Sequence, residues 1–200
     1  GDAAMLELLG YEFIQNALMA GLLASVVCGL VGALVVVNRI VFISGGIAHA
    51  AYGGIGLAFF FGISELFGAA VFALASAAIM AWVTVENKQR ADTVIGVLWA
   101  VGMAIGIVLV DLSEGYTADL MSFLFGSIIA VSRQDLVFMS ILTAIVVGSV
   151  AYFYRDLLAM SFDEEYAKLS GVPVRALHFL LLLLIALSVV LLIRVVGLIL

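Results

Sequence analysis

Charged residues are scarce in this chain, which has 200 residues of which only 11% are Asp, Glu, Lys or Arg. Soluble domains carry about 25% charged and about 45–50% apolar residues. Here 66% of the residues are hydrophobic and the mean hydropathy is +1.33. So little polar surface cannot cover a soluble core, which excludes a soluble enzyme, a nucleic-acid-binding protein and a disordered chain. The net charge of −6 likewise argues against a polybasic site for nucleic acid or lipid.

Cysteine is almost absent, and so are the groupings that catalysis requires. Because Cys28 is the one cysteine, no internal disulfide can form, and its apolar surroundings predict a small packing residue. The sequence shows no paired aspartates within an apolar run, no Ser/His/Asp set and no phosphate-binding loop. We therefore expect neither an enzyme nor a bound cofactor.

Long apolar runs define the fold class. A transmembrane helix needs about 20 apolar residues, and helices satisfy their own backbone polar groups in lipid. We expect an all-α, polytopic transmembrane helix bundle of about six spans, forming a single domain over residues 1–200. The predicted spans are residues 13–37, 40–62, 66–85, 93–110, 136–154 and 177–193. Because the sequence stops inside an apolar run, at residues 195–200, we also expect the native chain to continue beyond residue 200.

The distribution of Lys and Arg predicts the orientation. The apolar run at residues 120–132 is short for a span, so we interpret it as a re-entrant segment. Six of the eight cations then face the cytoplasm, namely Arg39, Lys88, Arg90, Arg155, Lys168 and Arg175, leaving Arg133 and Arg194 outside. If this segment spanned instead, all later charges would change sides. The outer face carries carboxylates that we interpret as solvated loop charges rather than as a cation-attracting entrance: Asp2, Glu7, Glu12, Glu65, Asp111, Glu114, Asp119 and Asp135.

Small residues recur four apart in several spans, a pattern that allows close helix packing in membranes. They predict a compact bundle rather than separate anchors. The second span carries Gly46, Ala50, Gly54 and Ala58, and the fourth carries Gly102 and Gly106. The first span has two such rows: Ala20, Ala24, Cys28, Gly32, and Gly21, Ser25, Gly29, Ala33.

His49 is an ionisable residue inside the second span. Such residues are costly in lipid and often mark a transport path, and imidazole is a good ligand for transition metals. The alternative is a packing histidine hydrogen-bonded to a neighbouring helix, and the sequence leaves both open. Tyr52 is a second polar candidate, whereas His178, at the start of the sixth span, is interpreted as interfacial.

The longest polar stretch, residues 155–176, contains a predicted short helix. Ser161 and Glu164 have the spacing of a capping box, and Gly171 followed by Pro173 indicates its end. Phe162, Tyr166 and Leu169 fall on one apolar face. A helix this short is marginal alone, and it lacks the many basic residues of membrane-surface helices. We therefore expect it to dock on a protein partner.

Several segments together resemble the permease subunits of metal-type ABC importers, which take up zinc, manganese or iron. The resemblance rests on the order and spacing of ISGGIAH at 43–49, ADLMSFLFG at 118–126, FDEEYAKLSGV at 162–172 and VVG at 195–197. It implies a multi-pass subunit of the cell (inner) membrane that passes a divalent metal inward between two permease copies. It also implies a cytoplasmic ATPase subunit that holds ATP and Mg²⁺, and an extracytoplasmic metal-binding protein.

The resemblance assigns roles to particular residues. The metal path would include His49, Tyr52 and Gly45, and Gly45 stands where the family usually has an aspartate one turn before the histidine. A second family aspartate, after Phe125 and Gly126, is Ser127 here. The ATPase would dock on a cytoplasmic coupling segment, 155–176, through Phe162, Asp163, Glu164, Tyr166, Ala167, Leu169 and Gly171.

Two other functions are compatible with a polytopic bundle. An autonomous secondary transporter or channel for a small cation would move its cargo without ATP and would use carboxylates buried within spans. Here almost every carboxylate lies at a span end or in a loop. A membrane scaffold without transport would be indifferent to replacement of His49.

Overall fold

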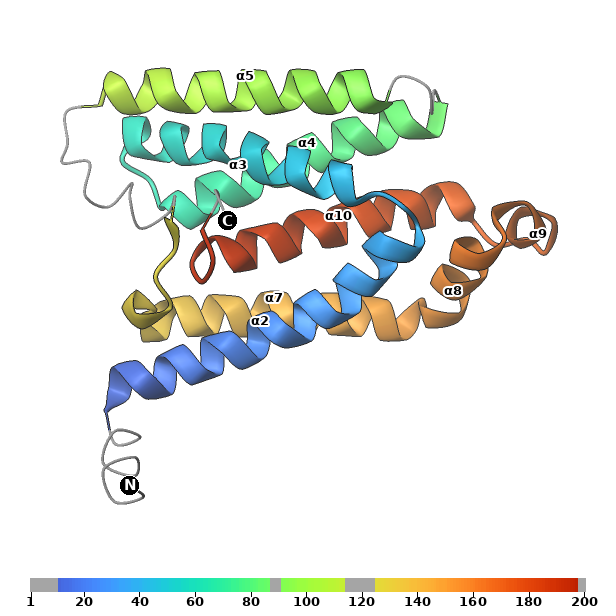
Figure 1. Ribbon diagram of the computed structural model, residues 1–200, viewed down its shortest axis with the longest axis horizontal. Coiled ribbons are helices and arrows are strands. Elements are labelled where there is room, and N and C mark those ends of the chain that lie inside the picture. Colours follow the sequence, from blue (N-terminus) through green and yellow to red (C-terminus); the bar gives the residue numbers. More distant parts are fainter. Residues whose placement is uncertain (1–10, 87–90, 114–124, 198–200) are drawn as a thin grey trace.

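The computed structural model describes residues 11–86, 91–113 and 125–197, and within these ranges the chain is helical, without strands (Figure 1). Six helices in the described part are long and apolar enough to cross a membrane, as predicted. They are α2 (Glu12–Val37), α3 (Val41–Phe61), α4 (Glu65–Glu86), α5 (Ala91–Asp111), α7 (Arg133–Tyr152) and α10 (Val174–Ile193). The shorter elements are the 3-10 helix η2 (Ile128–Ala130), α8 (Tyr154–Phe162) and α9 (Glu164–Leu169).

Helix α10 lies in the middle of the bundle, with α3, α4 and α5 on one side and α2 and α7 on the other (Figure 1). Its side chains Leu181, Leu182 and Ile185 are almost completely buried. A run of leucines on a helix surrounded by other helices has no need of a polar face. This explains why the most hydropathic span of the sequence is also a central one.

Glycines bring α3 against both of its neighbours. A Cβ at Gly54 would collide with the carbonyl oxygen of Gly68 in α4, and a Cβ at Gly56 would lie 2.6 Å from the Cα of Gly106 in α5. The predicted packing rows of the second and fourth spans are therefore confirmed.

The rows in the first span pack only in part. Ala20 and Ala24 are buried, but a Cβ at Gly29 or Gly32 would meet nothing within 4 Å. Cys28 is exposed, so the prediction of a packing residue is wrong. The reason is that α2 diverges from α3 beyond their turn and leaves this face of α2 uncovered (Figure 1).

Helix α5 ends at the same end of the bundle at which α7 begins (Figure 1). The Ser127 N–H donates to the carbonyl oxygen of Arg194 at 3.2 Å, which ties residues 125–132 to the end of α10. This supports the non-spanning interpretation of 120–132, although residues 120–124 lie outside the described residues. So do Lys88, Arg90, Asp2, Glu7, Glu114 and Asp119.

Asp135 is not a solvated loop charge, and that prediction is wrong. It is 6% exposed, and its Oδ2 lies 3.2 Å from Nη2 of Arg194. The error arises because α7 begins at Arg133, before the first apolar residue of the run. Asp135 therefore occupies the first turn, where it forms a capping box with Ser132.

Candidate transport path and coupling surface

A groove of about 450 Å³ lies between α2, α3 and α10 and contains two of the three predicted path residues, Gly45 and His49. Its other polar lining groups come from Cys28, Ser44 and Ser188. The hydroxyls of Ser44 and Ser188 donate to carbonyl oxygens of their own helices. The groove is thus mostly apolar, with one imidazole as its strongest potential metal ligand.

Tyr52 does not reach this groove. It is buried between α3 and α5, where a Cβ at Gly106 would collide with its ring. Tyr52 lies nearly one turn after His49 and packs on Gly106 of α5, the same helix whose Trp99 contacts His49.

His49 is half-buried and stacks on Trp99 of α5, with ring centroids 4.0 Å apart and ring planes 11° apart. It makes no hydrogen bond to any residue that the structure describes. The alternative reading, a histidine hydrogen-bonded to a neighbouring helix, is therefore not what this part of the chain adopts. Stacking covers the face of the imidazole and leaves its nitrogens at the ring edge. Sequence reasoning missed Trp99, because nothing in the spacing links it to His49.

A tight metal centre is not formed by the described residues, which contain no group of three or more His, Cys, Asp or Glu side chains able to share an ion. A structural zinc site takes four protein ligands. A metal in the groove would therefore be held weakly, as cargo that has to leave again.

Helix α9 is capped differently from the prediction. Ser161 belongs to the last turn of α8, where its hydroxyl donates to the carbonyl oxygen of Leu157 at 2.7 Å. The N-cap of α9 is Asp163, whose Oδ1 accepts the Tyr166 N–H at 2.9 Å. The Ser161 capping box is therefore wrong, because α8 continues through Phe162 and Asp163 is an equally good cap.

The predicted end of this helix is confirmed. Gly171 has φ +83°, and the N–H groups of Gly171 and Val172 donate to the carbonyl oxygens of Lys168 and Ala167 at 3.2 and 3.0 Å. This is the Schellman arrangement, which favours glycine at that position. Pro173 then stands directly before the first residue of α10.

Helix α9 has one buried side and one exposed apolar side. Ala167 is fully buried, whereas Phe162, Tyr166 and Leu169 are 80%, 66% and 88% exposed. The apolar face that the sequence predicts is therefore present and is not covered by this chain.

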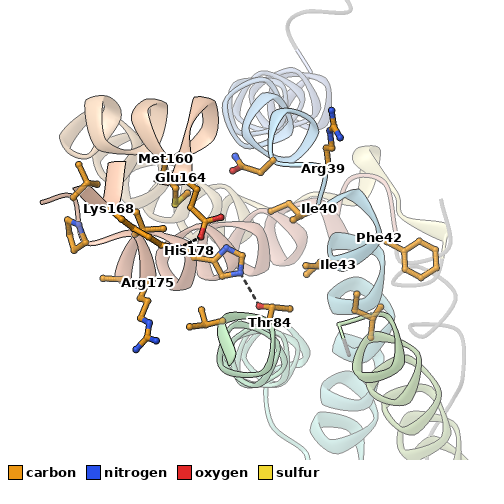
Figure 2. Close-up of a pocket in the computed structure, with 17 residues that line it drawn as sticks. Arg39, Ile40, Phe42, Ile43, Thr84, Met160, Glu164, Lys168, Arg175 and His178 are labelled. Atoms are coloured by element: carbon orange, nitrogen blue, oxygen red, sulfur yellow. Dashed lines mark hydrogen bonds and ion pairs between the residues drawn. The ribbon is translucent and has the colours of Figure 1, made fainter. Parts of the chain in front are cut away.

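A second cavity, of about 910 Å³, lies beside α9 at the same end of the bundle (Figure 2). His178 lines it, and Nε2 of His178 is 3.0 Å from Oγ1 of Thr84 in α4. The interpretation of His178 as merely interfacial missed this contact. The signal available in the sequence was that Thr84 and His178 are polar residues at the same end of two predicted spans.

Six apolar helices in the described part of the chain, with an exposed short helix at one end, define a multi-pass membrane protein. The model of the ABC 3 transport family matches residues 10–200, and the chain belongs to this family. The resemblance to permeases of metal-type ABC importers is thereby confirmed.

Relatives agree with this assignment. The chain is 52% identical over 98% of its length to an uncharacterized membrane protein of Synechocystis, covering 70% of that protein. It is 39% identical over 92% of its length to a probable metal transport system membrane protein of Chlamydia muridarum, covering 65% of it. It is 34% identical over 97% of its length to the manganese transport system membrane protein MntC of Halalkalibacterium halodurans, covering 66% of it.

A solved structure has the same fold. PsaBC from Streptococcus pneumoniae, in complex with Fab, matches with a TM-score of 0.85 and 32% identity, over 100% of this chain and 72% of that one. The chain thus spans about two thirds of the length of the proteins to which it is similar.

Proposed function

We propose that this chain is the membrane-spanning subunit of an ATP-driven importer that moves a divalent transition-metal ion, such as zinc, manganese or iron, into the cytoplasm. Family membership and the names of the relatives support transport of a metal. The observation that carries the proposal is the exposed apolar face formed by Phe162 at the end of α8 and by Tyr166 and Leu169 of α9.

This face is the docking surface for a cytoplasmic ATP-binding subunit, which holds ATP and Mg²⁺. A six-residue helix is too short to be stable alone. Here Asp163 caps its start, Gly171 ends it and Ala167 anchors it to the bundle. The helix is therefore pre-formed, with Glu164 held by Lys168 at 2.6 Å and the apolar face turned outward. A pre-ordered surface loses little conformational entropy on binding.

The metal path follows the groove that His49 and Gly45 line, and a second permease copy covers it. An extracytoplasmic metal-binding protein delivers the ion. A single imidazole suits transient binding, because an ion that must be released cannot be held by a full ligand set. Tyr52 contributes indirectly, since it packs α3, the helix of His49, against α5.

The alternative is an autonomous secondary transporter or channel for a small cation. Such proteins couple to protons or sodium through carboxylates buried in the membrane. Among the described residues, Asp135 is the buried carboxylate, and Arg194 already neutralises it. No observation therefore favours ATP-independent transport over the importer.

Co-purification tests the proposal. The full-length protein, expressed with the ATP-binding subunit of its transporter, retains that subunit, and the double variant Phe162→Ala plus Leu169→Ala loses it. Phe125→Ala is the matched control, because Phe125 is exposed and adjoins Gly126, which lies against Gly197 beyond the end of α10, whereas α9 precedes the start of α10. Metal transport into liposomes by this chain alone, without ATP, would contradict the proposal.

A further inference from the structure

His178 connects two transmembrane helices at the end of the bundle that carries α9. The Thr84 hydroxyl donates its one proton to the backbone, with the carbonyl oxygen of Met80 at 2.7 Å. The lone pairs of the Thr84 Oγ1 then face Nε2 of His178, which is 3.0 Å from this oxygen. The tautomer that matches this arrangement carries its proton on Nε2 and donates it to Thr84. This fixes the orientation of the ring between α10 and α4.

The other side of the ring faces α9. Figure 2 shows the carboxylate of Glu164 directed toward the imidazole of His178. Glu164 is the first residue of α9, and its Oε1 lies 2.6 Å from Nζ of Lys168 one turn later. Arg175, which lines the same cavity, points away from this cluster (Figure 2). Three polar side chains therefore follow one another from α9 through α10 to α4, namely Glu164, His178 and Thr84.

This line lies behind the surface that we assign to the ATPase. Phe162 at the end of α8 and Tyr166 and Leu169 of α9 are exposed, whereas Glu164 of α9 is directed toward His178 (Figure 2). A further contact joins α2 to α8, because Nδ2 of Asn38 donates to Oγ of Ser161 at 2.8 Å. Glu164, His178 and Thr84 thus offer a route of polar side chains from α9 to α4, and such side chains have discrete arrangements rather than a continuous range.

We propose that His178 is a positioning residue that couples movement of α9 to α4, through Glu164 on one side and Thr84 on the other. The inference rests on the proposed function, because it assumes that an ATPase moves α9. In this proposal His178 transmits the movement and binds neither the metal nor the ATPase. Loss of the residue therefore uncouples ATP hydrolysis from transport while the complex stays assembled.

The experiment measures metal uptake per ATP hydrolysed by the purified permease–ATPase complex in liposomes. His178→Ala and Thr84→Val retain the ATPase subunit and its basal hydrolysis, and each lowers uptake per ATP by about tenfold, within the usual range of coupling between sites. The double variant falls no further, because both residues serve one connection. His178→Gln, whose amide N–H donates to Thr84, recovers part of the loss.

Arg175→Gln is the matched control, an exposed cation one turn before His178 in the same cavity. Thr84→Val replaces a hydroxyl by a methyl group in a side chain of equal shape. If this variant has the uptake per ATP of the wild type, the inference is overturned. Additive losses in the double variant overturn it as well, and so does loss of the ATPase from His178→Ala and Thr84→Val. Failure of the unmodified protein to retain its ATPase is a different outcome, because it contradicts the proposed function itself.

Discussion

The guanidinium of Arg194, at the end of α10, lies 3.2 Å from the carboxylate of Asp135, in the first turn of α7. The Asp135 side chain is only 8% exposed, and it also accepts the N–H and the hydroxyl of Ser132 at 3.0 and 2.9 Å. One carboxylate thus caps α7 and joins it to the central helix. The same end of α10 accepts the N–H of Ser127, so these contacts together close that end of the bundle.

Removal of Arg194 should destabilise the protein strongly. Arg194→Gln leaves the Asp135 charge buried without its partner, which costs about 3 kcal/mol or more. The control is Arg133→Gln, because the ion pair of Arg133 with Glu12 has side chains that are 77% and 62% exposed and contributes less than about 1 kcal/mol. Thermal unfolding in detergent measures both variants. Equal losses of stability in the two would show that burial of the Asp135 pair has no energetic consequence.

Helix contact through glycine leads to a second prediction. Gly54→Ala places a methyl group against the backbone of Gly68, and overpacking of this kind costs about 1–3 kcal/mol. Gly148→Ala in α7 meets nothing within 4 Å, so it should be neutral or stabilising, because alanine favours a helix by about 1 kcal/mol over glycine. The measurement is again the unfolding temperature in detergent. A Gly54→Ala protein as stable as Gly148→Ala would mean that α3 and α4 do not approach through Gly54.

The sequence predicts those parts of the fold that depend on hydropathy. Apolar runs of membrane length locate the six spans, and the glycine at position 171 locates the end of α9. Helix starts are less predictable, because polar residues such as Asp135 extend a span beyond its apolar run. The cap of α9 was misplaced for a similar reason, since Ser161 and Asp163 are both good caps and only the length of α8 decides between them.

The candidate site is less accessible to sequence reasoning than the fold. His49 is recognisable because an ionisable residue inside a span is rare. The stack of His49 on Trp99 and the contact between Thr84 and His178 each join residues that are far apart in the chain. They therefore depend on how the helices are placed side by side. Tyr52 shows the converse, because proximity to His49 in the sequence does not bring it to the groove.

Restoring the aspartate that the family usually has should strengthen metal binding. A Cβ at Gly45 would lie 3.9 Å from the ring of Trp99, an ordinary contact, so Gly45→Asp fits without a clash. The new carboxylate lies one turn from His49 on the same face of α3 and provides a second ligand to the ion. We expect the dissociation constant for Mn²⁺ or Zn²⁺ to fall by at least about tenfold, which corresponds to about 1.4 kcal/mol. Isothermal titration calorimetry measures it.

Two controls accompany that measurement. Gly45→Ala adds bulk without a ligand and should leave the affinity unchanged. Gly45→Asp combined with His49→Ala should lose the gain, because the carboxylate then acts alone. An equal gain in the presence and absence of His49 would contradict the role of His49 as a ligand in this groove.

The stack of His49 on Trp99 provides an optical signal for metal in the groove. The chain has two tryptophans, and Trp82, which is 64% exposed, can be replaced by phenylalanine to leave Trp99 as the single fluorophore. A Ni²⁺ ion bound at an edge nitrogen of His49 would lie close to an indole whose centroid is 4.0 Å from the imidazole. Because an open-shell ion at that range quenches fluorescence, emission should fall on titration with Ni²⁺ and recover on chelation. The same titration of the His49→Ala variant should leave the emission unchanged, whereas equal quenching in both proteins would show that the ion binds elsewhere than at His49.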